Sequence, residues 1–448
     1  MARVGKRRIT VTGTGYLGAT HAACMAELGF EVLGMDVDAE KIGVLASGRS
    51  PFFEPGLNEV LARNVASGRL RFTTDPAELA AFGGEGAVHF LCVNTPQSAG
   101  SDAADLRYLN LAVEALAPHL TESCVVVGKS TVPVGTAAAV ADRLRELAPA
   151  AVETAWNPEF LREGHAVADT LRPDRLVVGV ESAEAEQALR DVYASLLEDG
   201  VPFLTMDLAT SELVKTAANS FLATKISFIN AMAEVCEAAD ADVVLLAQAL
   251  RLDPRIGTRF LEPGLGFGGA CLPKDIRGFA ARSRELGVGE ALAFLHEVDG
   301  INLRRRARAV TLARELCGGS LEGRRVAVWG AAFKPDSDDV RDSPALSVAD
   351  ALAGEGALVT VYDPEARDNA AKFLPHLGFA DSAREAALDA HVVVHATEWP
   401  EFREIDPAEA AGWVAQPHLV DCRNTLDPAA WRGAGWTVAA LGRPAAAR

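Results

Sequence analysis

Ile9-Thr10-Val11-Thr12-Gly13-Thr14-Gly15-Tyr16-Leu17-Gly18 is the stretch that decides the fold. Its apolar start predicts a strand, and a helix is expected after the glycines as far as Leu28, where Gly29 ends it. A second strand, expected over residues 31–35, ends in Asp36, about twenty residues after the glycines. Glycines spaced G-x-G-x-x-G between a strand and a helix are typical of a dinucleotide-binding βαβ unit.

The residue types in this unit indicate which dinucleotide it binds. The glycines permit a tight turn and a close approach of a pyrophosphate, which then rests on the helix N-terminus. Asp36 can accept hydrogen bonds from ribose hydroxyls, and its charge repels a 2′-phosphate. The motif therefore predicts NAD rather than NADP; the alternative is an accidental glycine turn.

Length, charge and cysteine usage limit the possible classes of protein. A chain of 448 residues is too long for one core and predicts about two or three domains. The net charge of −18 argues against nucleic acid or an anionic membrane as partner. The seven cysteines form no C-x-x-C pair, so no disulfide framework or metal site is expected. No apolar run suits a signal peptide or a membrane span, so we expect a cytoplasmic protein.

The rest of the first domain, taken as residues 1–206, places polar residues after predicted strands. Strands are expected over residues 87–93, 124–128, 151–155 and 176–180. Thr95 and Thr131 follow two of them, at the edge where open α/β sheets bind ligands, although ordinary turn chemistry is an alternative. Glu159 and Glu163 are four residues apart and are expected to share one face of a turn. They could serve as base and ligand, or simply be two solvated carboxylates.

The middle of the chain, taken as residues 207–318, predicts one long helix. Residues 209–239 contain no Gly or Pro and have apolar positions at helical spacing. Lys215 and Asn219 are four residues apart and project from one face, where they could stabilise an oxyanion. The alternative is a surface lysine beside an asparagine in the helix interior.

Gly266-Phe267-Gly268-Gly269-Ala270-Cys271-Leu272-Pro273-Lys274-Asp275 is the second glycine-rich stretch. Proline suits the first turn of a helix, so Cys271 is expected just before a helix N-terminus. The helix dipole at that position favours a thiolate, which is the nucleophilic form of cysteine. The alternative is a half-buried structural cysteine.

The third domain, taken as residues 319–448, repeats the pattern of the first. Residues 324–330 echo residues 7–13, and a strand expected over residues 358–362 ends in Asp363, as the earlier one ends in Asp36. Its loop lacks the glycine fingerprint, so a second NAD is not expected, but Lys334 and Arg341 could meet phosphates there. Strands are also expected over residues 391–395 and 418–420, and fraying of the Ala-rich end beyond Pro444. The fold predicted is α/β, with two Rossmann-like doubly wound domains joined by a central helical domain with one long helix.

The chain resembles the UDP-glucose/GDP-mannose dehydrogenase family along nearly its full length. The resemblance is carried by residues 13–18, 130–136, 157–164, 215 with 219 and 225–230, 266–275 and 333–343. It implies a four-electron oxidation of UDP-glucose to UDP-glucuronate with two NAD⁺, through a cysteine thiohemiacetal and thioester and without release of the aldehyde. It also implies a homodimer or larger homo-oligomer built on the long middle helix.

The resemblance further implies a role for each matching residue. Cys271 would be the nucleophile, Lys215 and Asn219 would stabilise oxyanions, Asp275 with Thr131 would hold a water, and Glu159 would aid thioester hydrolysis. The cofactor contacts implied are Gly13, Gly15, Tyr16, Leu17, Gly18, Asp36, Lys41, Thr95, Thr131, Glu163, Lys274 and Arg341. The substrate contacts implied are Glu159, Phe160, Leu161, Lys215, Asn219, Arg255, Phe260, Leu261, Gly268, Cys271, Lys334 and Arg423, with Arg255 reaching a neighbouring subunit. No metal is implied.

Two short segments disagree about the sugar. Leu272 stands where many UDP-glucose enzymes of this family carry phenylalanine, and Leu-Pro also occurs in the GDP-mannose and UDP-N-acetylmannosamine enzymes. Asp253-Pro254-Arg255-Ile256-Gly257 is more similar to the UDP-glucose group. The alternatives are therefore the same reaction on GDP-mannose or UDP-N-acetylmannosamine, a two-electron β-hydroxyacid-type dehydrogenase that needs no cysteine, and a non-enzymatic NAD-binding regulator.

Overall fold

The computed structural model describes residues 7–444, which form two compact units. The first unit contains the described residues up to Ala218 together with Ala281–Gly287, and the second contains Asn219–Ala280 and the described residues from Val288 onward. Helix α10 (Leu208–Ala239) contributes residues to both units. The three predicted domain boundaries stay predictions, and the Ala-rich end beyond Pro444 lies outside the described residues.

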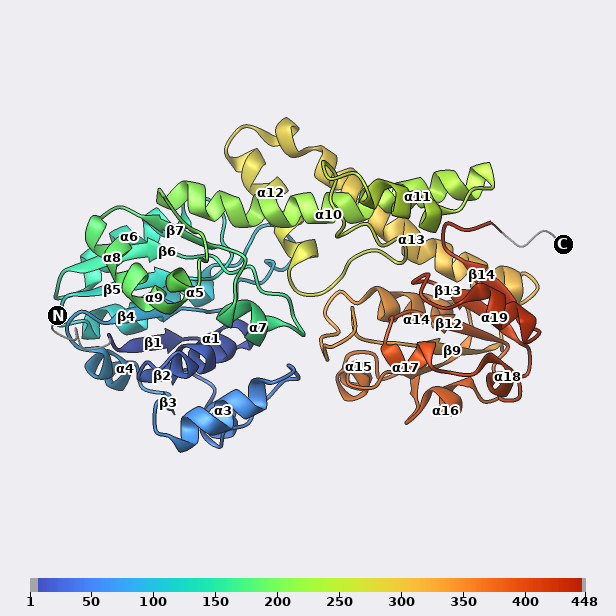
Figure 1. Cartoon of the computed structure of the whole chain (residues 1–448), viewed down its shortest axis with the longest axis horizontal. Helices are drawn as coiled ribbons and strands as arrows, with labels where there is room; N and C mark the ends of the chain where they lie inside the picture. Colours follow the sequence, from blue (N-terminus) through green and yellow to red (C-terminus); the bar gives the residue numbers. More distant parts are fainter. Residues whose placement is uncertain (1–6, 445–448) are drawn as a thin grey trace. The chain divides into compact units, whose positions relative to one another are not determined.

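The first unit contains an eight-stranded sheet in the order β3-β2-β1-β4-β5-β6-β7-β8 (Figure 1). Its strands are β1 (Ile9–Thr12), β2 (Val32–Met35), β3 (Leu70–Thr73), β4 (Val88–Leu91), β5 (Cys124–Gly128), β6 (Val152–Trp156), β7 (Leu176–Val180) and β8 (Phe203–Met206). All neighbours pair in parallel except β6 and β7, which are antiparallel. The strand order reverses between β1 and β4, and ligands bind at the carboxyl ends of strands at such a point.

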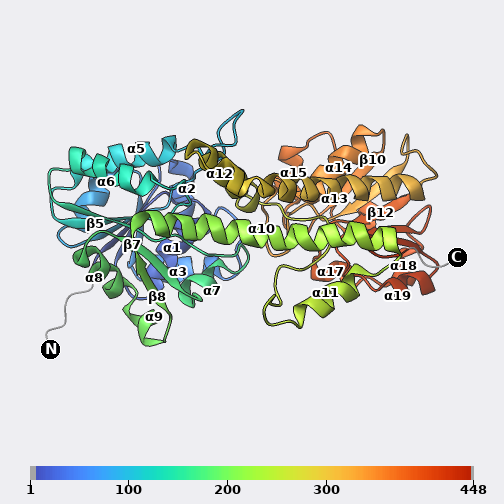
Figure 2. The same cartoon turned by 90° about the horizontal axis from the view of Figure 1, so that it is seen from above.

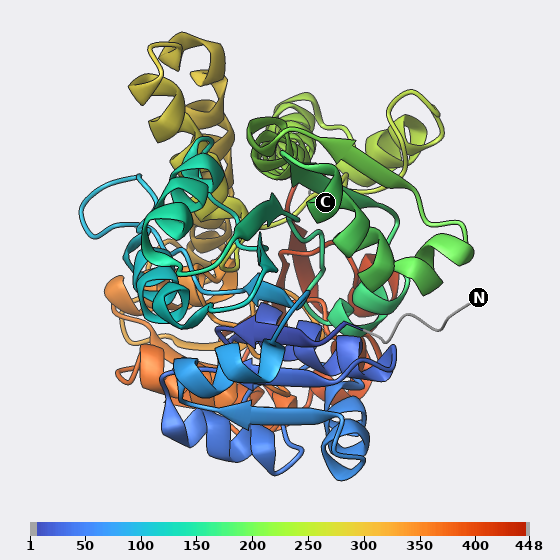
Figure 3. The same cartoon turned by 90° about the vertical axis from the view of Figure 1, so that its left-hand side faces the viewer.

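Successive residues of the central strands enter apolar clusters on opposite faces of this sheet, because side chains alternate along a strand. In β5, Val125 and Val127 join one cluster and Val126 joins the other. The first cluster also receives α1 (Tyr16–Glu27), α3 (Leu57–Ala66) and α8 (Ala183–Val192), and the second receives α4 (Pro76–Gly83), α5 (Arg107–Leu116) and α6 (Thr136–Leu147). Helices therefore cover both faces (Figure 3). The remaining helices of this unit are α2 (Ala39–Ala46), η1 (Ala117–His119), α7 (Ala166–Leu171) and α9 (Ala194–Glu198).

The predicted long helix is confirmed: α10 has 32 residues and is about 48 Å long (Figure 2). Asp207 caps it, because its Oδ1 accepts a 2.8 Å hydrogen bond from the Thr210 N–H. In the second unit, α13 (Phe294–Leu316) packs along α10 through a 2.7 Å hydrogen bond from Ser227 Oγ to the Val298 carbonyl. The other helices of the middle region are α11 (Val243–Arg251), α12 (Leu272–Glu285) and η2 (Gly289–Leu292).

The second unit contains a six-stranded, fully parallel sheet in the order β11-β10-β9-β12-β13-β14. Its strands are β9 (Arg325–Trp329), β10 (Leu358–Tyr362), β11 (Gly378–Phe379), β12 (Val392–His395), β13 (His418–Asp421) and β14 (Thr437–Ala440). Around them lie α14 (Pro344–Gly354), α15 (Arg367–Phe373), α16 (Ala383–Ala387), α17 (Pro400–Arg403), α18 (Pro407–Ala410) and α19 (Pro428–Gly433). The order repeats that of the first six strands, so the predicted class of two Rossmann-like domains with a long central helix is confirmed. Within the described residues, no helix combines the length and apolar character needed to cross a membrane.

Candidate active site

The glycine-rich loop between β1 and α1 has the shape that a dinucleotide needs. Gly13 has a φ of +86°, and a Cβ added to Gly18 would lie 1.8 Å from the Gly13 carbonyl oxygen, so both positions require glycine. A Cβ added to Gly15 would be 3.7 Å from its nearest neighbour, the Asn94 side chain, so space remains beside the start of α1. These residues fit a pyrophosphate held at a helix N-terminus.

Asp36 and Lys41, both predicted to contact the cofactor, lie together at the end of β2. Asp36 Oδ2 accepts hydrogen bonds of 2.9 Å from Lys41 Nζ and 2.9 Å from the Thr14 N–H. Burial, the largest influence, would raise the pKa of Asp36, but the hydrogen bonds from Lys41 and from backbone N–H groups together lower it. Asp36 is therefore a carboxylate, as an acceptor for ribose hydroxyls must be.

Glu159, Phe160, Leu161 and Lys215 form a cluster in the first unit. Lys215 Nζ lies 2.9 Å from Glu159 Oε1, with the side chains 5% and 13% exposed. The Leu161 N–H donates to Glu159 Oε2 at 2.6 Å, and the Lys215 ammonium lies 5.4 Å from the centroid of the Phe160 ring. Burial would raise the pKa of Glu159, but the charge and hydrogen bond of Lys215 and the Leu161 N–H outweigh it and lower this pKa.

The backbone around Glu159 differs from the expectation in one respect. Residues 157–162 are irregular and contain no helical turn. The expectation that Glu159 and Glu163 share one face of a helical turn is therefore wrong. The Glu159 carboxylate instead binds the N–H two residues onward, a local contact that competes with helix formation.

Two further contacts join predicted cofactor residues at the carboxyl edge of the first sheet. Thr95 Oγ1 donates a 2.7 Å hydrogen bond to the Thr131 carbonyl, which ties the loop after β4 to the loop after β5. The Gly164 N–H, next to Glu163, donates to Glu54 Oε2 at 2.7 Å, and the hydroxyl of Tyr16 donates to the same oxygen. Glu54 thereby joins the glycine-rich loop to the segment that carries Glu163.

Asn219, Lys274 and Asp275 form a second cluster, in the second unit. Asn219 Nδ2 donates to Asp275 Oδ2 at 2.6 Å, and Lys274 Nζ lies 2.6 Å from Asp275 Oδ1. The Asp275 N–H donates to the Cys271 carbonyl at 3.0 Å, which closes the first turn of α12. The prediction that Cys271 stands just before a helix N-terminus is confirmed.

Cys271 differs from the other cysteines in its exposure. Of the seven cysteines, all within the described residues, Cys271 is exposed and the other six are buried. Burial raises the pKa of Cys92 to about 12, which keeps that thiol protonated. Cys271 is therefore the cysteine whose sulfur can reach a ligand.

The glycine-rich loop before Cys271 presses against the rest of the second unit. Asn302 of α13 accepts a 2.7 Å hydrogen bond from the Phe267 N–H and donates one of 2.9 Å to the Phe267 carbonyl. A Cβ added to Gly266 would lie 1.8 Å from Asn302 Oδ1, and one added to Gly268 would lie 2.3 Å from the Asp342 carbonyl oxygen. Glycine at these positions is what allows the close approach.

The remaining residues predicted for the substrate mostly surround this loop. Arg423, just after β13, donates to the Gly266 carbonyl at 3.3 Å and to the Phe333 carbonyl, next to Lys334, at 3.3 Å. The Arg341 carbonyl accepts a 3.0 Å hydrogen bond from the Gly269 N–H. Leu261 is buried, and Phe260 has a φ of +64°.

Arg255 is placed differently from these residues. It pairs with Asp253 at 2.6 Å while its side chain is 87% exposed. An exposed guanidinium is consistent with the predicted role toward a neighbouring subunit, which stays a prediction.

Sequence reasoning missed several buried polar residues that support the predicted ones: Lys129, Asn157, Glu54 and Asn302. Lys129 and Asn157 belong to stretches quoted for the resemblance, but without any role. A lysine directly after an apolar strand and an asparagine inside a helix are the signals that could have identified Lys129 and Asn302.

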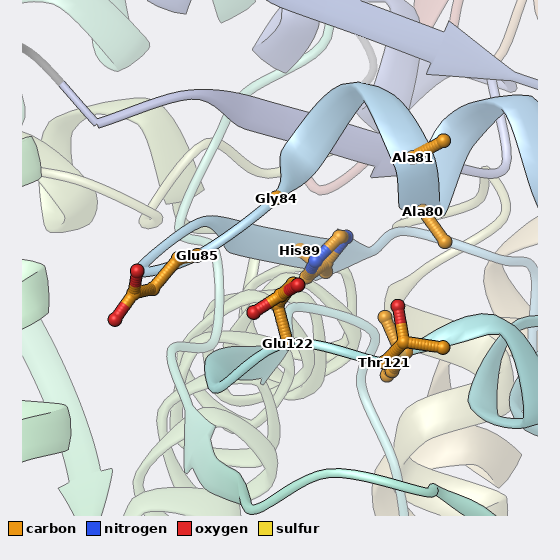
Figure 4. A pocket seen from close by; sticks show the side chains of 8 residues that line it. Ala80, Ala81, Gly84, Glu85, His89, Thr121 and Glu122 are labelled. Carbon is orange, nitrogen blue, oxygen red and sulfur yellow. The ribbon is translucent and has the colours of Figure 1, made fainter.

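A hollow of about 360 Å³ lies elsewhere on the first unit (Figure 4). It is lined by Ala80, Ala81, Gly84, Glu85, His89, Leu120, Thr121 and Glu122. Most of these residues precede β4 or β5, so the hollow lies at the amino edge of the sheet. None of the predicted site residues lines it.

Comparison with known proteins identifies the class. Residues 7–197 match the NAD binding domain of the UDP-glucose/GDP-mannose dehydrogenase family, residues 209–304 its central domain, and residues 327–428 its UDP binding domain. The chain belongs to the UDP-glucose/GDP-mannose dehydrogenase family and uses NAD as its cofactor.

Individual relatives are similar over nearly their whole length. The chain is 41% identical to a UDP-glucose 6-dehydrogenase of Rhizobium meliloti strain 1021, over 98% of this chain and 100% of the relative. A UDP-glucose dehydrogenase from Pyrobaculum islandicum has a structure with a TM-score of 0.88 and 36% identity, over 96% of this chain and 100% of that one. A UDP-D-ManNAc dehydrogenase from Pyrococcus horikoshii has a TM-score of 0.85 and 27% identity, over 97% and 99%.

Proposed function

We propose that this protein oxidises UDP-glucose to UDP-glucuronate with two NAD⁺. One observation carries the choice of sugar: similarity is highest to enzymes named for UDP-glucose, at 41% and 36% identity, and falls to 27% for the enzyme named for UDP-D-ManNAc. All three extend over nearly the whole chain, so the difference is not one of coverage.

The oxidation of a primary alcohol to an acid requires a nucleophile from the protein. NAD⁺ supplies the hydride acceptor for each of the two oxidations. An aldehyde cannot lose hydride until a nucleophile has added to its carbon, and the Cys271 thiolate is proposed to add there. A C–S bond forms, and the negative charge passes to the former carbonyl oxygen. After the second oxidation the sugar is held as a thioester on Cys271. Attack by water then breaks the C–S bond, with Cys271 leaving as a thiolate and the sugar leaving as a carboxylate.

The two clusters are proposed to stabilise charge in these steps. Lys215 and Asn219, one helical turn apart on α10, provide an ammonium and an amide N–H for the oxyanions. Asp275, whose two oxygens are held by Asn219 and Lys274, is proposed to hold the hydrolytic water and accept its proton, with Thr131 as a second ligand of that water. Glu159 is proposed to assist thioester hydrolysis.

Binding residues are proposed in two groups, which follow the two glycine-rich loops. NAD is assigned to the loop of residues 13–18 with Asp36, Lys41, Thr95 and Glu163, together with Lys274 and Arg341. The nucleotide sugar is assigned to Phe160, Leu161, Phe260, Leu261, Gly268, Lys334 and Arg423, with Arg255 serving a neighbouring subunit.

The test is the number of NADH molecules formed per UDP-glucose consumed, with UDP-N-acetylmannosamine and GDP-mannose as parallel substrates. We expect two NADH per UDP-glucose and no turnover of the other sugars. One NADH per sugar would support the two-electron alternative, and turnover of another sugar alone would change the substrate. A matched control, Cys422→Ala, removes a buried thiol and should retain turnover, whereas Cys271→Ala should abolish formation of the acid.

We also propose a homodimer formed along α10, in the cytoplasm. Phe221, Phe228 and Val235 are 67%, 50% and 57% exposed. Seven residues separate each from the next, so they form one apolar stripe, which a second copy of the helix would cover. Light scattering after size exclusion should give twice the chain mass for the wild type and a monomer for Phe228→Glu. A monomeric wild type would refute the dimer.

A further inference from the structure

Lys129 is a buried cation beneath the Glu159–Lys215 pair. It follows β5 directly and is 6% exposed. Its Nζ donates to Asn157 Oδ1 at 3.0 Å and to the Asn157 carbonyl at 3.4 Å, and it lies 5.7 Å from the centroid of the Phe90 ring. These direct partners are uncharged, although burying an ammonium is unfavourable unless its charge is compensated. Packing alone does not explain a lysine here.

Asn157 transmits the position of Lys129 to Glu159. Asn157 is 1% exposed and donates through Nδ2 to the Val177 carbonyl at 2.8 Å, so its side chain is fixed to β7. Tyr193 donates to the same Asn157 Oδ1 at 2.7 Å. Glu159 is two residues further along this irregular segment, and its place depends on how Asn157 is anchored.

The Lys129 charge also acts on Glu159 through space. The groups that face Lys129 or its partner Asn157 come from α1, the end of β4, the Glu159 segment, the start of α9 and α10: His21, Cys92, Glu159, Tyr193 and Lys215. Burial keeps His21, Cys92 and Tyr193 neutral near pH 7, by lowering the pKa of the first and raising the pKa of the other two. Glu159 is the negative charge of this group, and two ammonium groups, Lys129 and Lys215, act on it.

We propose that Lys129 is a positioning residue of the reaction: it anchors Asn157 and supplies a second positive charge that keeps the Glu159 carboxylate ionised and in place. This inference rests on the proposed function, in which Glu159 assists thioester hydrolysis. Lys129 acts through Asn157 and through its field, and it need not touch the sugar.

The experiment compares Lys129→Met with Lys129→Arg and Tyr193→Phe. Lys129→Met removes the charge, Lys129→Arg keeps it, and Tyr193→Phe removes a hydrogen bond from the same Asn157 oxygen without changing charge. For Lys129→Met we expect kcat to fall roughly 10- to 100-fold with little change in KM for UDP-glucose. The acid limb of its pH profile should move up by about one pH unit, because loss of a nearby cation raises a carboxyl pKa. Lys129→Arg should retain the wild-type acid limb, and Tyr193→Phe should retain both the limb and kcat.

A wild-type pH profile in Lys129→Met, or an equal shift in Tyr193→Phe, would overturn the proposal. If Lys129→Met does not fold, Lys129→Gln, which keeps an N–H donor without the charge, carries the same expectation. Failure of both neutral variants to fold would assign Lys129 to stability alone and would also overturn it.

A measurement on the protein without ligands separates this inference from the proposed function. In ¹³C-glutamate NMR spectra, the Glu159 carboxyl signal is identified by its absence in Glu159→Gln. We expect its titration midpoint to rise by about one pH unit in Lys129→Met. If it rises while the wild type does not oxidise UDP-glucose, the inference about Lys129 stands and the proposed function fails. If the wild type oxidises UDP-glucose and the midpoint does not move, the inference about Lys129 fails alone.

Discussion

Replacing Lys215 by methionine should destabilise the first unit strongly, because it leaves the Glu159 carboxylate buried without its ammonium. The two groups are 2.9 Å apart, and at an effective dielectric constant of about 20 their attraction is about 6 kcal/mol. Desolvation offsets much of this attraction in the intact pair. When one partner is removed, the desolvation of the other is no longer compensated, so Lys215→Met should cost about 3–5 kcal/mol.

A double-mutant cycle with Glu159→Gln isolates the pair. Glu159→Gln should also be costly, because Lys215 then stays buried without a carboxylate. The double variant contains neither charge, so its loss should be smaller than the sum of the two single losses by about 2 kcal/mol or more. Because the pKa of Glu159 is lowered in the fold, the pair stabilises at neutral pH, and its contribution disappears as the pH falls through that lowered pKa.

The measurement needs to report on one unit at a time, because a chain of two compact units need not unfold in one step. Pulse labelling of buried thiols in urea, with peptides analysed by mass spectrometry, provides this: Cys24 and Cys92 report on the first unit, and Cys317 and Cys422 on the second. As a matched control, Arg143→Met breaks surface ion pairs with Glu114 and Glu146 and should leave the first unit unchanged within error. A change below about 1 kcal/mol for Lys215→Met, or additive losses in the cycle, would refute the reasoning.

Three other outcomes are expected. Burial lowers the pKa of Lys129 from 10.5 to about 8, so the unfolded chain binds more protons between these values, and the unfolding free energy should rise with pH there; urea titrations should show a slope of up to about 1.4 kcal/mol per pH unit that Lys129→Met lacks. Gly18→Ala places a Cβ 1.8 Å from the Gly13 oxygen, so NADH binding, followed by its fluorescence, should weaken by more than about tenfold while circular dichroism still shows a folded chain; normal affinity would contradict the proposed loop geometry. Asn302→Ala removes both hydrogen bonds to Phe267 and should destabilise the second unit by about 1–3 kcal/mol in urea, with an altered alkylation rate of the cysteine that follows the loop; an unchanged rate would show that the clamp does not position it.

The central strands could be predicted from the sequence because both of their faces are buried. β1, β2, β4 and β5 are buried along their whole length and read as continuous apolar runs. The edge strands β3 and β8, and the outer strand β14, contain partly exposed residues and were not predicted. Their pairing is decided by the sheet that they join, which no local pattern encodes.

The candidate site divides in a similar way. Motif residues such as Gly13, Asp36 and Cys271 could be identified because a short spacing implies their geometry. Lys129 and Asn302 could not, because each acts on a residue 28 or 35 positions away in the sequence. Contacts of this kind exist only after the strands and helices have packed together.

The two Rossmann-like sheets share a strand order, but the acid after the second strand is used differently in each. Asp363 accepts hydrogen bonds through Oδ2 from the N–H groups of Ala331 and Ala332 and from Trp399 Nε1, and through Oδ1 from those of Glu365 and Ala366. These five donors exceed the roughly four lone-pair sites of a carboxylate, and Asp363 is 1% exposed. The corresponding acid of the first sheet, Asp36, is 9% exposed and has a mobile ammonium, Lys41, among its donors. The acid of the second sheet is thus consumed in shaping its own loop. The same topology therefore leaves a ribose acceptor in the first sheet and a closed, structural carboxylate in the second.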